Sequence, residues 1–580
     1  MKFDVKHILF FYLFTLLAGA LFFIPAIFVN RFATAPALWI QAGISMGIMG
    51  YVLLTKNRIT LPPKSFILLI TIWATYHLWQ SGGNIENMTT IVTLVATFFL
   101  FHAIWKHLRD KKLLFAVFSL LAVILSLWGL GQFSGLLKPY HGSFNVTGPF
   151  DNPAGISAAL VVLLPFVLYT FLWTGKRHRA LSAAAVCLVA GVIILSRARA
   201  AILAMVVMII FFFFRMMRER DLKIRPVHHL FLFAGFLLLF TGMFFMKRDS
   251  ASGRLLMWRC SVQLVADRPF LGHGARGFTA NYMNEQASYF MKHPSSKYAM
   301  LADNVRHPFN EFLKWAVNHG LVGLCLTSLL IIVPLWGSRE DRSTELFAIR
   351  LGLLAAGVCA FFSYPFNYPF IRLMTVALLA FALAANPRKG ITALNGYFSK
   401  GIALLFSLGL LFSTTRQAYH EREWHKIAHR SLRGETDRML PRYESIYTYL
   451  NGNDLFLYNY AAELNVAGQY KISMKIAREC DNLWADYDLQ MLMADNCRQL
   501  QQHDETEGYL KKAAAMCPVK FMPLYQLTGL YLETGQEEEA RALAQKIMDK
   551  QVKIPSPIIN SIKNKMRNLL NEPKKHYDKS

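Results

Sequence analysis

The chain has 580 residues, of which 54% are hydrophobic and 14% aromatic, and its mean hydropathy is +0.31. This composition is that of a membrane protein rather than of a soluble globular enzyme. The formal net charge of +26 does not indicate nucleic-acid binding, because no binding module accompanies the charge. Lys and Arg collect instead in the cytoplasmic loops of membrane proteins.

Apolar runs near the length of a spanning helix recur through the first 415 residues. Thirteen candidate spans lie at 8–29, 36–54, 65–80, 89–105, 113–133, 154–173, 180–196, 199–214, 229–246, 321–336, 346–363, 370–385 and 401–414. We therefore predict an all-α, polytopic membrane protein of about 12–13 transmembrane helices. The membrane domain covers residues 1–415.

The distribution of basic residues predicts how the spans are oriented. With a cytoplasmic N-terminus, clusters such as Arg215, Arg218 and Arg220 fall in loops that face the cytoplasm, whereas the opposite short loops have few basic residues. This orientation places the long polar loop at 247–320 outside the cytoplasm. It places a C-terminal domain at 416–580 on the same outer side.

The C-terminal domain is polar, is expected to be helical and contains a repeat. Similar patterns occur at 461–470, 493–510 and 527–544. We predict that Gly468, Gln502 and Gly535, which are 34 and 33 residues apart, hold the same position in successive turns between helices. The period resembles that of tetratricopeptide repeats, whose stacked helix pairs form a concave binding surface. An unrelated helical bundle is the alternative.

The seven cysteines form neither a CxxC pair nor a metal-ligand cluster. A disulfide bridge among the tail residues Cys480, Cys497 and Cys517 remains one alternative. No Walker-type loop, HExxH or DxD-like motif is present near the outer face, and carboxylates are sparse there. We expect no metal and no cofactor.

The loop at 247–320 is the longest polar interruption of the membrane domain and has ten Lys or Arg residues against five acidic ones. Arginine offers a planar fork that matches phosphate oxygens, so the loop favours an anionic ligand such as a lipid pyrophosphate. Arg254 and Trp258 are spaced to share a helix face. Gly272, Gly274 and Gly277 predict a tight turn that could approach a ligand. The candidate binding residues are Arg197, Arg199, Arg254, Arg259, Arg276 and Asn310.

His307 is the candidate general base, because a neutral imidazole can accept a proton from a hydroxyl near neutral pH. It begins the sequence HPFNEFL, where an amphipathic helix is expected to run into the next span. His273 competes for the role, but its neighbouring glycines suggest a turn residue. His319 is expected at a helix end.

Several motifs together resemble the O-antigen ligase and polymerase superfamily, which includes bacterial O-oligosaccharyltransferases. They are FDNPAG, SRARAAIL, GRLLMW, ADRPFLGHGARGF and HPFNEFLKWAVNHGLVG, and they cover roughly residues 140–340 in this order. The resemblance implies a metal-independent, inverting GT-C-type enzyme at the periplasmic face of the bacterial inner membrane. It implies transfer of a glycan from undecaprenyl pyrophosphate to an acceptor hydroxyl.

The resemblance also implies residue roles. Arg254 and Arg197, or Arg199 in its place, would bind pyrophosphate, and His307 would activate the acceptor. Many relatives read His-x-His-Asn, whereas this chain has Phe309 at the second histidine position. If that second histidine is the base in those relatives, another residue or the acceptor itself must supply the base here.

The leading hypothesis is a lipid-linked glycan transferase, with the lipid A core, a growing glycan or a protein Ser or Thr as the acceptor. These acceptors correspond to an O-antigen ligase, an O-antigen polymerase and a protein O-oligosaccharyltransferase. The helical tail could recruit the acceptor or a protein partner. A transporter or flippase of lipid-linked sugars is the rival, although the two halves show no internal repeat. A scaffold without catalysis would leave the arginine-rich loop without a role.

Overall fold

The computed structural model describes residues 5–54, 60–108, 110–173, 175, 179–219, 241–242, 248–336, 343–385, 391–392 and 397–572. The chain divides into two compact units. The first comprises Met1–Met246, Phe309–Trp315 and Leu321–His425. The second comprises Lys247–Pro308, Ala316–Gly320 and Lys426–Ser580, so that the long loop and the tail belong to one unit.

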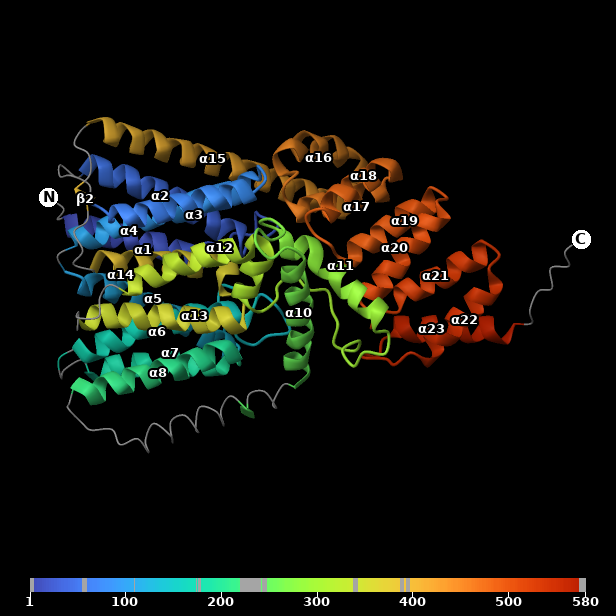
Figure 1. Ribbon diagram of the computed structural model, residues 1–580, viewed down its shortest axis with the longest axis horizontal. Helices are drawn as coiled ribbons and strands as arrows, with labels where there is room; N and C mark the ends of the chain where they lie inside the picture. The colour runs from blue at the N-terminus through green and yellow to red at the C-terminus, as the bar shows by residue number, and fades with distance from the viewer. Residues whose placement is uncertain are drawn as a thin grey trace, which may run out of the picture. The chain divides into compact units, whose positions relative to one another are not determined.

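The first unit is a bundle of apolar helices that run side by side (Figure 1). Its elements are α1 (Val5–Phe22), α2 (Thr34–Leu54), α3 (Lys64–Gln80), α4 (Ile85–His107), α5 (Lys112–Phe133), α6 (Pro153–Trp173), α7 (Arg179–Leu195), α8 (Arg199–Glu219), α13 (Thr344–Phe362), the 3-10 turn η2 (Pro365–Asn367), α14 (Pro369–Ala385) and most of α15 (Tyr397–Arg430). Two-residue strands, β1 (Thr60–Leu61) and β2 (Ile391–Thr392), pair antiparallel. The predicted all-α class is confirmed.

The core of this bundle lies around α6 and α14. Almost every residue of α14 is buried, and 78% of the apolar window of α6 is buried. A helix that is apolar on all sides is stable only where other helices surround it, which explains the central position of both. Phe115, Phe118 and Phe166 fill the contact between α5 and α6 with ring centroids 4.8 to 5.0 Å apart across the interface.

Seven of the described helices are long and apolar enough to cross a membrane, and three shorter apolar helices accompany them. Helices occupy twelve of the thirteen predicted positions. The thirteenth, at 229–246, lies outside the described residues apart from 241–242. The structure is therefore that of a multi-pass membrane protein.

The second unit combines the loop with the tail. Its helices are α10 (Arg248–Asp267), α11 (Gly277–Lys292), the π-helical turn η3 (Ser431–Glu435), α16 (Thr436–Leu450), α17 (Asp454–Val466), α18 (Tyr470–Asp481), α19 (Tyr487–Gln499), α20 (His503–Met516), α21 (Met522–Glu533), α22 (Glu537–Asp549) and α23 (Pro557–Asn571). Helices α17 to α23 form a row in which each packs against the next, and α11 packs against α20 (Figure 1). α12 (Glu311–Trp336) contributes residues to both units and is kinked at Gly320.

Three turns of the tail share one backbone geometry, at Gly468, Gln501 and Gly535. All three residues have positive φ, between 60° and 75°. In each turn the following amide donates to the carbonyl five residues before it, as from Gln469 to Leu464. This Schellman-type ending stops one helix so that the next can turn back. The prediction that Gln502 holds the middle position is wrong by one residue, because Gln501 is the left-handed residue.

The seven cysteines are all free thiols. Cys480, Cys497 and Cys517 are buried at three separate places in the tail helices. The sulfur of Cys480 donates to the carbonyl of Asp454 and that of Cys497 to Glu505. All three thiols are free, so the alternative of a disulfide bridge in the tail is wrong.

Candidate functional site

The corner between α7 and α8 holds two of the predicted arginines, and it belongs to the first unit. The Ser196 hydroxyl donates to the Ile193 carbonyl at 2.6 Å and accepts from the Ala198 amide at 3.3 Å. Arg197 lies in this turn with φ 55° and an exposed side chain, while Arg199 begins α8 and is half-buried. A turn, and not a continuous helix, therefore sets the different directions of the Arg197 and Arg199 side chains.

The next predicted arginine, Arg254, lies on α10 in the second unit. It is half-buried and lies one turn before Trp258 on the same helix face. The Trp258 indole donates to the Pro308 carbonyl at 3.0 Å. This bond attaches the arginine-bearing face of α10 to the residue that follows His307. The shared face was predicted from the spacing, but its contact with Pro308 was not.

Arg259 lies on a different face of α10 from Arg254. Its side chain is exposed, and its guanidinium stacks on the Tyr289 ring of α11 at 5.0 Å from the ring centroid. Such a cation–π contact fixes the direction of the side chain while leaving its N–H groups on the surface. The structure thus places Arg259 next to α11.

The glycine-rich turn packs against backbone rather than presenting an open ligand surface. Gly272 has φ 68°, and a Cβ there would lie 2.5 Å from the Asn318 carbonyl oxygen. The amide of Gly274 donates to the same carbonyl at 2.8 Å. The His273 ring donates to the Leu264 carbonyl at 2.8 Å, as expected of a turn residue. The expectation that these glycines approach a ligand is corrected, because they approach residues 317–320.

Asn318 is a buried residue that sequence reasoning missed. Its side-chain oxygen accepts from the Phe278 amide at 2.8 Å, and its side-chain nitrogen donates to the Ala275 carbonyl at 2.8 Å. It therefore ties the second half of the glycine turn to the chain just before Gly320. The only sequence signal is an amide side chain within an apolar helix pattern.

Arg276 and Arg306 both contact Asp454, the first residue of α17. The Arg276 Nη1 atom lies 2.7 Å from Asp454 Oδ1, and Arg306 Nη2 bonds to the other carboxylate oxygen. Arg306 also stacks on Trp484 at 4.1 Å from the ring centroid. Arg276, named from the sequence as a binding residue, therefore lies in an ion cluster of the second unit.

The segment that follows His307 crosses from the second unit into the first between Pro308 and Phe309. Phe309 has φ 55°, an unusual conformation for an aromatic residue. Asn310, another predicted binding residue, is 5% exposed, and its side-chain oxygen accepts from the Leu313 amide at 3.0 Å. Asn310 is therefore the N-cap of α12.

Phe309 belongs to an aromatic cluster that the sequence did not reveal. Its ring lies 5.1 Å from that of Tyr364, which stacks with Tyr368 at 6.1 Å, and Tyr368 meets Phe150 at 5.3 Å. The cluster therefore joins the FDNPAG turn to the HPFN segment. Burial raises the pKa of Tyr368 well above its usual value, so the phenol stays protonated. The available signal was the second PFN sequence at 365–367.

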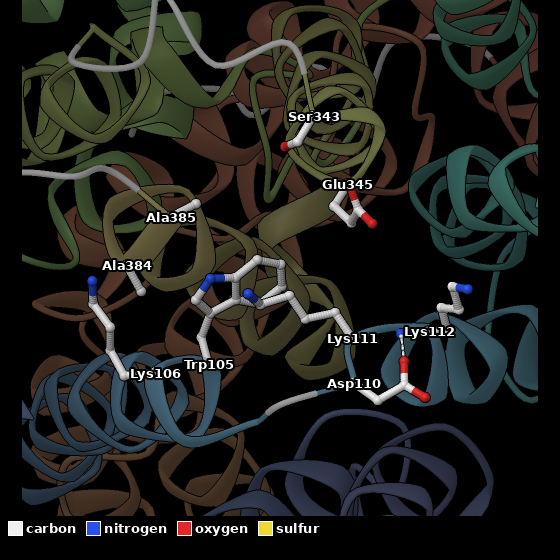
Figure 2. Close-up of a pocket in the computed structure, with 9 residues that line it drawn as sticks. All are labelled: Trp105, Lys106, Asp110, Lys111, Lys112, Ser343, Glu345, Ala384 and Ala385. Atoms are coloured by element: carbon white, nitrogen blue, oxygen red, sulfur yellow. Dashed lines mark hydrogen bonds between the residues drawn. The ribbon is translucent and has the colours of Figure 1, made fainter.

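One pocket of the first unit lies away from these residues. It has a volume of about 520 Å³ and is lined by Trp105, Lys106, Asp110, Lys111, Lys112, Ser343, Glu345, Ala384 and Ala385 (Figure 2). Ala385, which lines the pocket, ends α14, whereas Tyr368 of the aromatic cluster lies just before the start of that helix. The 17 residues of α14 span roughly 25 Å, which separates the pocket from the cluster.

Among the described residues, no group of three or more His, Cys, Asp or Glu could hold a metal ion.

The fold defines a multi-pass helical membrane protein with a large unit built from one loop and the tail. Residues 183–328, a quarter of the chain, match the family model described as O-antigen ligase. The match supports the O-antigen ligase superfamily for this segment, and the segment contains every site residue named from the sequence. No curated protein matches the chain.

Proposed function

We propose that this protein transfers a glycan from undecaprenyl pyrophosphate to an acceptor hydroxyl, as an O-antigen ligase-like, metal-independent and inverting enzyme. One observation carries the proposal. Within the segment that matches the O-antigen ligase model, the Trp258 indole bonds to Pro308. This bond brings the helix that carries Arg254 to the residue that follows His307, which supports the proposal that a cation for phosphate and a base for a hydroxyl act at one site.

The proposed reaction needs one proton transfer and one displacement. His307 takes the proton of the acceptor hydroxyl, and the acceptor oxygen attacks the anomeric carbon of the glycan. The bond from that carbon to the pyrophosphate oxygen breaks, and the lipid pyrophosphate leaves as an anion. Arg254, together with Arg197, stabilises the charge that develops on the leaving group. Phe309 supplies no base at the position of the second histidine in relatives.

The proposed orientation follows from the basic loops. The N-terminus is cytoplasmic, and the second unit faces the periplasm from the inner membrane. The donor's lipid tail then stays in the bilayer while its glycan reaches the loop. The domains proposed from the sequence, 1–415 and 416–580, separate membrane-embedded chain from the helical tail.

The acceptor decides between an O-antigen ligase, an O-antigen polymerase and a protein O-oligosaccharyltransferase. We propose that the tail, whose turns recur at Gly468, Gln501 and Gly535, is tetratricopeptide-like and recruits the acceptor. Stacked helix hairpins commonly offer such a binding surface. In the O-antigen ligase-like reaction, the acceptor is the lipid A core.

The test is a transfer assay with the full-length protein in lipid nanodiscs. The donor is an undecaprenyl-pyrophosphate-linked oligosaccharide, and the acceptors offered are lipid A core, a second donor molecule and a Ser-containing protein. R254A and H307A should each lower the rate by roughly a hundredfold or more, the size typical for loss of an electrostatic or general-base group. Arg268 is exposed on the same loop, so R268A should retain activity.

Two results would contradict the proposal. One is transfer by R254A and H307A at near wild-type rates. The other is a complete loss in EDTA that Mg²⁺ reverses. The acceptor that receives the glycan distinguishes the three related activities, while movement of the lipid-linked glycan across the bilayer without transfer would favour a flippase.

A further inference from the structure

Residues 304–306, which lead directly into His307, are held by side chains of the tail. The Asn304 side-chain nitrogen donates to Asp486 at 2.6 Å. Arg306 bonds to Asp454 and stacks on Trp484. Each of these contacts joins residues more than a hundred positions apart in the chain. The conformation of this segment therefore depends on helices that the chain makes much later.

The carboxylate of Asp454 is placed to hold two cations at once. One oxygen contacts Arg276 and the other contacts Arg306, so that the two arginines share it. The Asp454 side chain is 14% exposed, against 20% for Arg276 and 35% for Arg306. Charge-assisted bonds in such a partly desolvated place are stronger than those on an open surface.

The surroundings of Asp454 keep this geometry rigid. The loop and the tail share one apolar core, which includes Leu256, Tyr282, Ala485 and Met516. The amide of Ala485 donates to the Thr279 carbonyl at 2.9 Å. The Gln286 side chain donates to the carbonyls of both Asp303 and Met516, at 3.0 and 2.7 Å. The packing of the tail against the loop therefore holds Asp454 in a fixed position.

We propose that Asp454 is a positioning residue for the transfer site: by binding Arg306 and Arg276 together, it fixes the backbone that carries His307. This proposal rests on the proposed function. His307 lies between two anchors, because Arg306 is bound to the tail and Pro308 is bound to Trp258 of α10. Asp454 touches neither donor nor acceptor. It acts through the arginines, and its role is to keep the imidazole at reacting distance.

The proposal predicts a defect in the chemical step rather than in donor binding. Asparagine keeps the shape of Asp454 but removes its charge, which leaves two arginines without their shared anion. D454N should lower kcat by roughly ten- to a hundredfold, since a displacement near 1 Å can cost about a hundredfold. The KM for the lipid-linked donor should change by less than about threefold, because Arg254 is untouched. D454E retains the charge and should recover part of kcat.

The matched control is D504N. Asp504 also lies in the first turn of a tail helix, α20, but its side chain is exposed. D504N therefore removes the same favourable interaction of an acid with a helix N-terminus, but it removes no contact with the loop.

Combining D454N with R306Q should lower kcat no more than the worse of the two single changes, because both break the same contact. A kcat of D454N within twofold of wild type, or equal losses in D454N and D504N, would overturn the proposal.

A second measurement does not depend on transfer. Hydrogen–deuterium exchange of the full-length protein follows the peptide that covers residues 303–309. D454N should raise exchange in this peptide by roughly tenfold, as expected when a local contact is lost, and D504N should not. Unchanged exchange in D454N would exclude the positioning role. Faster exchange in D454N, with no transfer by the wild type, would refute the proposed function and show only that Asp454 fixes the backbone at His307.

Discussion

Arg197 and Phe309 share a backbone conformation that L-amino acids rarely adopt. Both have φ 55°, and among the described residues Gln501 is the third non-glycine residue with positive φ. A left-handed L-residue costs about 1–2 kcal/mol, so surrounding contacts must maintain it. At Arg197 the Ser196 hydrogen bonds do so, and at Phe309 the ring contact with Tyr364 contributes. Both residues border the segments to which we assign donor and acceptor chemistry.

The sequence predicted the local geometry around the candidate site residues better than their long-range partners. The spacing of Arg254 and Trp258 predicted their shared helix face, and the glycine content predicted a tight turn. The contact of Arg276 with Asp454 joins residues 178 positions apart, and no local pattern encodes such a pair. Asn310 illustrates the same limit, since its local role as the N-cap of α12 follows only once the start of that helix is known.

The buried thiols of the tail lead to a prediction about the reactivity of single residues. Burial raises the pKa of Cys497 and of Cys517 to about 12, and it also raises the pKa of Cys480. At pH 8 about one in ten thousand molecules of a thiol with a pKa near 12 is ionised, and the thiolate is the nucleophile. A water-soluble maleimide should therefore leave all three unmodified in the native protein and label them after denaturation. Mass spectrometry measures the result.

Glutathione provides the exposed-thiol control for this experiment. Labelling of any tail cysteine at the rate of glutathione would show that the native tail exposes that thiol. Such a result would contradict the burial of Cys480, Cys497 and Cys517.

Single turns determine the geometry of the helical elements. α12 begins at Glu311 and bends at Gly320, where φ is 63° and a Cβ would lie 2.1 Å from the Phe270 carbonyl oxygen. The predicted helix that runs into a span is present, and the boundary at residue 321 coincides with this bend. The close approach of two backbones explains the glycine, and the sequence alone did not reveal which backbone lies opposite.

The tail turns allow a matched test at the scale of one element. At Gly468, with φ 74°, an added Cβ meets no atom within 4 Å, so a substitution there tests backbone strain alone. Gly508 also has open space, but it lies within α20. We expect G468A to destabilise the tail by about 1 kcal/mol and G508A to stabilise it by about 0.5–1 kcal/mol. Urea unfolding of the full chain, followed by pulse proteolysis, measures both.

Equal effects of the two substitutions would show that the left-handed geometry of the turn does not matter. The repeat could be predicted because it recurs every 33 or 34 residues. The one-residue error at Gln501 arose because the middle turn has no glycine to mark the left-handed position.

On the scale of the whole molecule, the loop and the tail depend on one another. Their common core contains residues from 256 to 317 and from 485 to 517. We therefore expect a chain truncated after His425 to lose transfer completely, and not only acceptor recognition. Its loop should become sensitive to protease, because the buried faces of α10 and α11 would be exposed. The bundle of spanning helices should still insert into the membrane.

A chain truncated after Val552 is the matched control. It lacks α23, whose contacts belong to a separate apolar cluster with Phe521 and Ile547. The core shared by loop and tail is complete in this shorter protein, so transfer should persist. Normal activity of the chain that ends at His425 would disprove the mutual dependence of loop and tail.

The bond from Gln286 to the Met516 carbonyl, which spans 230 positions, also has a consequence for biosynthesis. A ribosome finishes the loop long before it makes the residues that complete the loop's core. Contacts of such high sequence separation form late in folding. Every membrane helix is therefore synthesised before the loop reaches its final form, and under the proposed function a nascent chain gains transfer activity only after the tail residues up to Cys517, which complete that core, have emerged.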